Sequence, residues 1–275
     1  MIELLMEMFS YNFLVRALIV GLLVALCAAL LGVSLVLKRY SMIGDGLSHV
    51  GFGTLAVATA LNVTPLVFSI PVVLLAAFLL LRISENSKIK GDAAIALIST
   101  GALAIGVVVI SLTTGLNTDV CNYMFGSILA MRKSDVVLSI VLALVVLILF
   151  VLFYHKIFAV TFDENFARAT GVKSPLYNDL LAFLTAITIV LGMRMMGALL
   201  ISSLIIFPPL TAMRLAKRFL SVTILSAVIS VVCFFIGVVI SYVYATPTGA
   251  SVVLVNIGAF GLFWLLGASR GRVRI

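Results

Sequence analysis

The chain has 275 residues, of which 64% are hydrophobic and only 10% are charged, and its formal net charge at pH 7 is +8. Soluble domains carry roughly a quarter charged residues, so this composition excludes an ordinary soluble globule. A mean hydropathy of +1.33 indicates that most of the protein surface faces lipid rather than water.

Long apolar runs predict nine membrane-spanning helices. Crossing about 30 Å of hydrocarbon takes roughly 20 helical residues, and long runs without alternation exclude a membrane barrel. The stretch 197–213 is short, contains two prolines and follows its neighbour almost directly, so a broken or re-entrant pair with eight full spans is the alternative. In chain order, the predicted spans are 12–37, 44–62, 64–82, 92–114, 134–154, 177–193, 197–213, 220–243 and 250–268.

Basic residues predict how these helices are oriented, and they argue against a nucleic-acid surface. They lie in short clusters between apolar runs, a distribution typical of cytoplasmic loops. With Lys38 and Arg39 in the cytoplasm, nine spans place the loops 155–176 and 214–219 in the cytoplasm and the N-terminus outside, and eight spans would change only the N-terminal part. Neither a linker nor a repeat interrupts the chain, so we expect one transmembrane domain over 1–275.

The second predicted helix carries a carboxylate and an imidazole on one face, because Asp45 and His49 are four residues apart. Ionisable groups inside apolar helices are costly and mark candidate functional sites. If the helix starts promptly, His49 lies on the order of 15 Å beyond Arg39, near the middle of the bilayer. These donors suit zinc, manganese or ferrous iron, whereas calcium and magnesium prefer oxygen alone.

Two ligands do not form a tight cage, so other side chains or water must complete the coordination shell. A purely structural interpretation also stays open for this pair. Asp45 could stabilise the N-terminus of its helix through the helix dipole, and His49 could hydrogen-bond inside the bundle.

The stretch 161–171 between two predicted spans indicates a short cytoplasmic helix of about two turns. Thr161 and Glu164 have the spacing of a capping box, and Gly171 suits the residue that ends a helix. Its apolar face is suited to dock into a groove on a partner, although a helix lying on lipid headgroups is the alternative. That face consists of Phe162, Phe166 and Ala169.

Motifs for nucleotide hydrolysis or hydrolytic chemistry do not occur in the sequence. It contains no GxxxxGK[ST] phosphate loop, no HExxH zinc site and no GxSxG nucleophile motif. If ATP drives transport, another subunit must bind it. We therefore expect a chain that is not itself an enzyme.

Five motifs in this order resemble the permease family of zinc and manganese ABC importers. The two most specific are Gly-Asp-Gly-Leu-Ser-His at 44–49 and Phe-Asp-Glu-Asn-Phe-Ala-Arg-Ala-Thr-Gly at 162–171. The resemblance implies an all-α polytopic membrane protein: a bundle of eight to nine transmembrane helices with a short cytoplasmic coupling helix, all in one permease domain. The other three motifs lie at 125–129, 196–208 and 247–254.

The resemblance also implies residue roles and partners. It makes Asp45 and His49 ion ligands in the pathway, and it assigns coupling to an ATPase to the residues Asp163, Glu164, Phe166, Ala167 and Gly171. The expected partners are a pair of ATP-binding subunits, an extracytoplasmic metal-binding protein, a second copy of the chain and membrane lipid, with no nucleic acid.

The function implied is import of zinc, manganese or iron across the cell membrane, with the ion as cargo and no permanently bound cofactor. Two other functions stay open at this point. One is a permease for a metal chelate, which needs a wide cavity. The other is a secondary transporter in which Asp45 carries a proton and no ATPase is needed.

Overall fold

The computed structural model describes residues 7–8, 10–86, 91–113 and 133–269. Within these residues all regular secondary structure is helical, and the predicted motif at 125–129 lies outside them. The helices are α2 (Asn12–Leu37), α3 (Ile43–Ala60), α4 (Pro65–Asn86), α5 (Gly91–Leu112), α7 (Lys133–Leu152), α8 (Tyr154–Phe162), α9 (Glu164–Ala169), α10 (Ser174–Met196), α11 (Ala198–Leu215), α12 (Phe219–Tyr244) and α13 (Thr248–Ser269).

Each of the nine predicted spans overlaps one long helix of the described chain. By length and composition, seven helices in this part of the chain could cross a membrane by themselves: α2, α5, α7, α10, α11, α12 and α13. Helix α3 has only 18 residues and includes four glycines and the Asp45/His49 pair, which lower its hydropathy. The all-helical, multi-pass architecture is confirmed, whereas the count of eight to nine spans stays a prediction.

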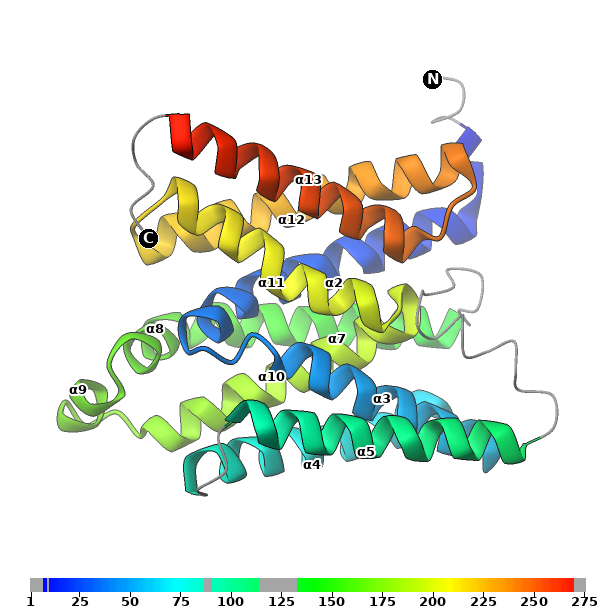
Figure 1. Cartoon of the computed structure of the whole chain (residues 1–275), viewed down its shortest axis with the longest axis horizontal. Helices are drawn as coiled ribbons and strands as arrows, with labels where there is room; N and C mark the ends of the chain where they lie inside the picture. Colours follow the sequence, from blue (N-terminus) through cyan, green and yellow to red (C-terminus); the bar gives the residue numbers. More distant parts are fainter. Residues whose placement is uncertain (1–6, 9, 87–90, 114–132, 270–275) are drawn as a thin grey trace.

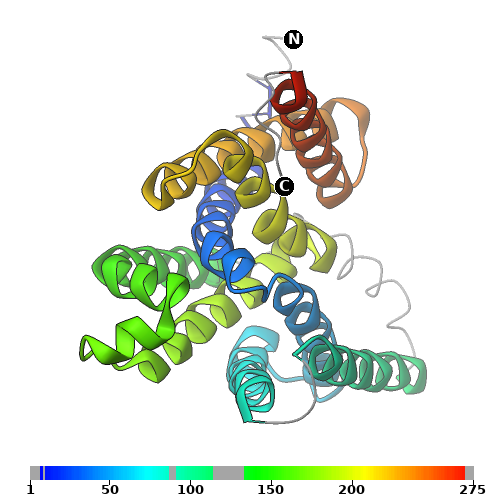
Figure 2. The same ribbon diagram turned by 60° about the vertical axis from the view of Figure 1, so that its left-hand side comes forward.

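The other helices form three groups around α2 and α10 (Figures 1 and 2). Helices α11, α12 and α13 pack together on one side, α3, α4 and α5 on a second, and α7 with α8 on a third. Helix α10 lies between these groups and contacts α2, α3, α4, α7 and α11. The connections from α2 to α3 and from α11 to α12 lie at the same end of the bundle as α8 and α9 (Figure 1), which agrees with one shared cytoplasmic side.

The predicted loop 155–176 is mostly helical. A break at Phe153 separates α7 from α8, and α8 continues to Phe162. Helix α10 begins at Ser174, earlier than the predicted 177, because Pro175 fits the first helical turn, where its missing N–H leaves no bond unmade. The region therefore presents two short helices at the end of the bundle rather than an irregular loop.

Helices α10 and α11 are joined by one residue, Gly197, whose φ of 85° is readily adopted only by glycine. The prolines do not break α11, which continues from Ala198 to Leu215. Pro209 cannot donate to the Ile205 carbonyl, and α2 packs against this freed oxygen. A methyl group at Gly32 of α2 would lie 2.2 Å from it, so the glycine permits the close approach.

Glycines also allow the neighbours of α3 to approach it closely. A methyl group at Gly53 would lie 2.5 Å from the carbonyl oxygen of Ala102 in α5, and one at Gly51 would lie 2.5 Å from Met193 in α10. Small residues at such positions are typical of close contacts between membrane helices. Helix α3 is thereby held in a fixed position, which in turn places the side chains that it carries.

Candidate metal site and cytoplasmic helix

Asp45 and His49 lie in the first two turns of α3 and come together as their spacing predicts. The His49 Nε2 atom is 3.7 Å from Asp45 Oδ2, too far for a good hydrogen bond. When two donor atoms bind the same ion, each lies about 2.0–2.2 Å from it, so the two donor atoms can be at most about 4 Å apart. The observed separation is compatible with one shared divalent ion.

The depth of this pair differs from the simple expectation, because α3 does not start directly after Arg39. A turn over 38–42 comes first, and the helix begins at Ile43. His49 therefore lies about 9 Å along α3, at 1.5 Å per residue, rather than about 15 Å beyond the end of α2. In Figure 1 the connection from α2 runs along the bundle before α3 starts, so the first turn of α3 lies away from the end at which α8 and α9 lie.

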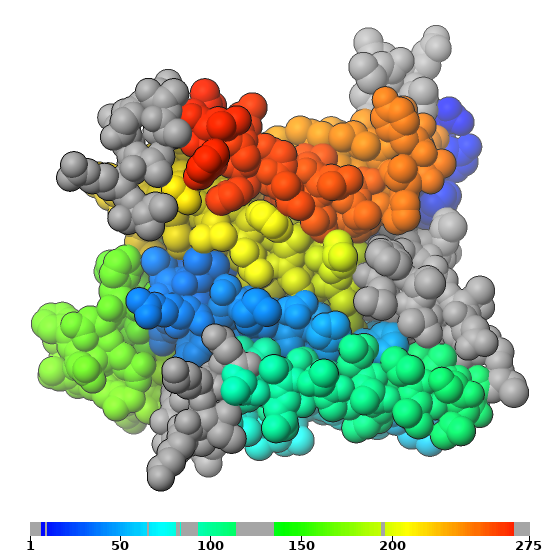
Figure 3. Space-filling model, in the orientation of Figure 1, coloured from blue at the N-terminus to red at the C-terminus, as the bar shows by residue number. Residues whose placement is uncertain are grey.

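One strip of α3 is left open by its neighbours. The helix contacts α4, α5, α10 and α11, and Figure 3 shows it at the surface between α5 and α11. The side chain of Asp45 is 45% exposed and that of His49 is 25% exposed, whereas Leu47 and Ser48 are buried. The carboxylate and the imidazole are therefore accessible from this face of the single chain.

The structural interpretation of the pair is supported for Asp45 and less well for His49. Asp45 lies in the first turn of α3, where a carboxylate interacts favourably with the helix dipole. In the part of the chain that the structure describes, the polar contact of the His49 side chain is the one with Asp45. The same part contains no group of three or more His, Cys, Asp or Glu side chains that could enclose a metal.

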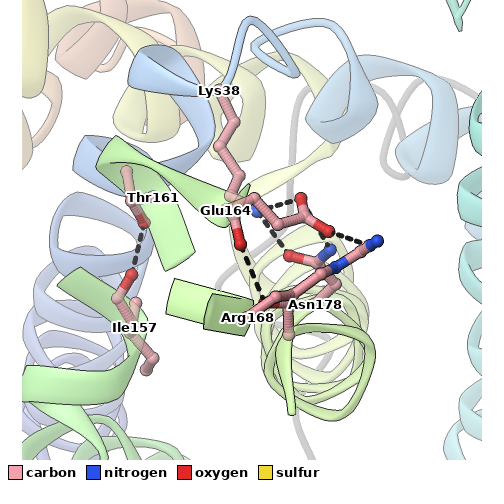
Figure 4. A network of polar contacts seen from close by, with 7 residues as sticks. Lys38, Ile157, Thr161, Glu164, Arg168 and Asn178 are labelled. Atoms are coloured by element: carbon pink, nitrogen blue, oxygen red, sulfur yellow. Dashed lines mark hydrogen bonds and ion pairs between the residues drawn. The ribbon is translucent and has the colours of Figure 1, made fainter. Parts of the chain in front are cut away.

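The short helix predicted within 161–171 is present as α9, with six residues. Its N-cap is Asp163, which has an extended backbone. The Asp163 carboxylate oxygen Oδ1 accepts a hydrogen bond from the Phe166 N–H at 2.9 Å, and so satisfies a backbone donor of the first turn. The predicted capping box from Thr161 is wrong. Since α8 continues to Phe162, Thr161 is still helical and donates to the Ile157 carbonyl instead (Figure 4).

Gly171 ends α9 as predicted. It has φ of +84°, its N–H donates to the Arg168 carbonyl at 3.0 Å, and the N–H of Val172 donates to the Ala167 carbonyl at 2.9 Å. These two bonds form a Schellman motif, which favours glycine at this position. The chain can thus reverse into α10 after little more than one helical turn.

The remaining residues of the predicted coupling set separate into an inner and an outer group. Ala167 is 1% exposed and packs inside, whereas Phe166 is 66% exposed and Phe162 is 59% exposed. The apolar face predicted to dock on a partner is therefore uncovered in the single chain.

The model of the ABC 3 transport family matches residues 10–266. The chain belongs to this family. The manganese import system permease protein ScaB of Streptococcus gordonii is 30% identical, over 92% of this chain and 91% of that protein. The high-affinity zinc uptake system membrane protein ZnuB of Haemophilus influenzae is 30% identical, over 92% of this chain and 97% of that protein. A probable iron transport system membrane protein of Haemophilus influenzae is 32% identical, over 98% of this chain and 96% of that protein.

Solved structures share the architecture of this ABC 3 family chain. PsaBC from Streptococcus pneumoniae, in complex with Fab, matches with a TM-score of 0.86 and 30% identity, covering 96% of this chain and 95% of that chain. An inward-facing metal-chelate type ABC transporter has a TM-score of 0.76 at 16% identity and shares the fold. The chain is an ABC transporter permease and a multi-pass protein of the cell membrane.

Two residues beside α9 of this permease were not identified as site residues from the sequence. Lys38, taken only as a marker of orientation, and Asn178 both contact Glu164 (Figure 4). Glu164 is 126 positions from Lys38 in the chain, and no local spacing rule connects residues so far apart. An Asn in the first turn of the predicted span 177–193 is the one signal that could have drawn attention to this site, because an amide inside an apolar helix needs a hydrogen-bond partner.

Proposed function

We propose that this permease is the membrane-spanning subunit of an ATP-driven importer of a divalent transition-metal ion: zinc, or alternatively manganese or iron. The observation that carries the proposal is the Asp45/His49 pair, 3.7 Å apart on the open strip of α3. Nitrogen plus carboxylate ligation suits these ions. The relatives named for manganese, zinc and iron transport support this class of cargo.

The second half of the site would come from a second copy of the chain. Because the pair lies on a strip of α3 that is open in the single chain, a two-fold symmetric partner placed there adds the same two ligands. Four donors from two copies, or two donors with water, complete a coordination shell. Such ligation is reversible, as release of a transported ion requires.

The proposed mechanism is alternating access in a bundle of eight to nine spans, with α3 and α4 crossing the membrane along with the more apolar helices. An extracytoplasmic binding protein delivers the ion. Two ATP-binding subunits dock on α9 at the cytoplasmic end through Phe166, while Asp163, Glu164, Ala167 and Gly171 shape and hold that helix. ATP binding moves α9, and the ligand pair then faces the other side of the membrane. No covalent step takes place in this chain.

A permease for a metal chelate is the main rival. Its cargo would need a wide polar cavity, whereas the cavity of about 240 Å³ between α3, α4 and α5 is lined almost entirely by apolar side chains. Asp45 and His49 do not line it. A proton-coupled transporter is the second rival, and it would carry metal without any nucleotide-binding subunit.

Direct metal binding separates these functions. We expect the purified permease complex to bind Zn²⁺ or Mn²⁺ as the free ion, and His49→Ala to lower that affinity by at least about tenfold, since even the groups that orient metal ligands contribute 10–100-fold. Met42→Ala, at an exposed position on the same helix end, is the matched control. Unchanged metal affinity in His49→Ala would refute the ligand assignment, and uptake by vesicles without the ATPase would favour the proton-coupled rival.

A further inference from the structure

Glu164 is the centre of a polar network that joins three helices (Figure 4). One carboxylate oxygen, Oε1, is 2.5 Å from Arg168 Nη2 within α9. The other, Oε2, is 3.9 Å from Lys38 Nζ at the end of α2 and accepts from Asn178 Nδ2 of α10 at 3.4 Å. Lys38 Nζ also donates to Asn178 Oδ1. The Asn178 amide thus presents its oxygen to the cation and its nitrogen to the carboxylate.

The Lys38 and Asn178 side of the network is sheltered from water, whereas Glu164 is partly exposed and Arg168 is exposed. The Lys38 side chain is 10% exposed, that of Glu164 is 33% exposed, and Asn178 is 8% exposed. Exposed ion pairs contribute little to stability, but removal of one partner from a buried pair leaves the other charge without compensation. The contact between Lys38 and Glu164 therefore favours one position of α9 relative to α2.

Other contacts of α9 hold it to α8 and α10. Ala167 is buried, and the Ser174 hydroxyl donates to the Glu164 carbonyl at 3.4 Å. Because Lys38 is the C-cap of α2, the contact between Lys38 and Glu164 connects α9 to the helix that leads into α3. Besides its neighbours in the chain, α9 is therefore linked to α2 through Lys38 and to α10 through Asn178.

Lys38 is directly continuous with the turn that leads into α3. The Arg39 N–H donates to the Val36 carbonyl at 3.1 Å, and the Tyr40 N–H donates to the Leu35 carbonyl at 2.8 Å, with Arg39 in the left-handed region at φ 62°. These bonds close the turn, so it moves as a unit with the end of α2. Asp45 follows only five residues after Tyr40.

Little free space separates the network from α3. A cavity of about 10 Å³, room for at most one water molecule, is lined by Lys38 and Asn178 together with Ile43 and Leu47 of α3. A movement of the network therefore meets α3 almost at once. The residues on the α3 side of this cavity flank Asp45 in sequence.

We propose that Glu164 is a positioning residue for transport: through Lys38 and Asn178 it passes the displacement of α9 to the turn between α2 and α3 and so to the Asp45/His49 pair. This role rests on the proposed function. It assigns to Glu164 a task inside the permease, distinct from the docking of α9 on an ATPase. Lys38 and Asn178 serve the same role, because they connect Glu164 to α2 and α10.

The test measures metal uptake and ATP hydrolysis together, in vesicles that contain the permease with its ATP-hydrolysing partner, using Zn²⁺ or Mn²⁺ delivered by the binding protein. Glu164→Gln and Lys38→Met should each lower the metal moved per ATP hydrolysed by about tenfold, the effect expected from the loss of a charge-assisted hydrogen bond. Lys38→Met, which lies outside α9, should also keep complex assembly and hydrolysis near the wild-type level. The double variant should be no worse than either single one.

Two variants serve as controls. Lys38→Arg keeps the charge and should retain the wild-type ratio of metal to ATP. Arg168→Gln removes a contact of the same carboxylate within α9 but leaves the link to α2, so it should change the ratio little.

Four results would overturn the positioning role: an unchanged ratio in both variants, an equal effect of Arg168→Gln, additive losses in the double variant, or a parallel loss of hydrolysis and uptake, which indicates a merely structural contact. Absence of metal uptake by the wild-type complex would instead refute the proposed function, and the positioning role with it.

Discussion

Gly53 of α3 packs directly against the backbone of Ala102 in α5, where an added methyl group would lie 2.5 Å from the carbonyl oxygen. One turn further along α5, Gly106 completes the contact, since a methyl group there would lie 3.0 Å from the Gly53 Cα atom. The two helices therefore meet backbone to backbone. Helix α5 contacts α3 and α4, so this contact fixes one flank of the helix that carries the Asp–His pair.

Gly53→Ala should separate α3 from α5. The Ala102 carbonyl belongs to the backbone and cannot turn away, so the helices must shift, and overpacking of this kind costs about 1–3 kcal/mol. We expect a lower thermal midpoint for the purified permease. Gly101→Ala, at a position of α5 with no atom within 4 Å of the added methyl group, is the matched control and should leave the midpoint unchanged or slightly raised. Equal midpoints for the two variants would contradict the close contact.

Asp45→Cys should change the metal preference of the permease. A thiolate is a softer ligand than a carboxylate and favours zinc over manganese. We expect the ratio of zinc affinity to manganese affinity to rise in titrations of the purified protein under reducing conditions. Asp45→Asn, which only weakens the oxygen ligand, should lower both affinities. If both substitutions changed the two affinities in parallel, Asp45 would act on the helix rather than on the ion.

Much of the architecture could be predicted because it follows from local chemistry. Long apolar runs predicted the helices, and the i, i+4 spacing predicted that Asp45 and His49 share one face of α3. Gly171 was recognised as a helix end because the left-handed conformation favours glycine. The capping box was wrong because α8 extends through Thr161, and a pattern of four residues does not reveal where the preceding helix stops.

The contacts that join distant segments could not be predicted from a single sequence. Lys38, Glu164 and Asn178 come from three helices, and only the packing of those helices brings them together. The start of α3 at Ile43 lies within one residue of the predicted 44, but the left-handed conformation of Arg39 in the turn over 38–42 was not predicted, because the residue type disfavours it. Tertiary structure overrides local preference at both places.

Phe166→Ala should weaken binding of the ATP-hydrolysing partner while leaving the permease itself intact. The ring is 66% exposed, so its removal costs the single chain little, whereas loss of a central aromatic anchor from an interface costs about 2 kcal/mol or more. We expect at least about a tenfold loss of affinity between the purified subunits. Leu112→Ala, which removes an exposed apolar side chain at the C-terminal end of α5, far from α9 (Figure 1), is the control.

Ala167→Leu tests the inner side of the same helix. The added side chain has no space at a residue that is 1% exposed, so the thermal midpoint of the permease alone should fall. A variant that kept its midpoint and lost the partner would place Ala167 at the interface, contrary to the structure.

Arg39→Gly should stabilise the permease despite the loss of a charge. Arg39 has φ 62°, a left-handed conformation that costs a residue with a Cβ about 1–2 kcal/mol, and glycine adopts it without that cost. Part of the gain is offset because glycine increases the entropy of the unfolded chain by roughly 0.5–1 kcal/mol. A net stabilisation of about 0.5–1 kcal/mol should appear as a small rise in the thermal midpoint. Arg218→Gly, the control, removes the same charge at a residue whose φ is −89°, and should lower the thermal midpoint instead.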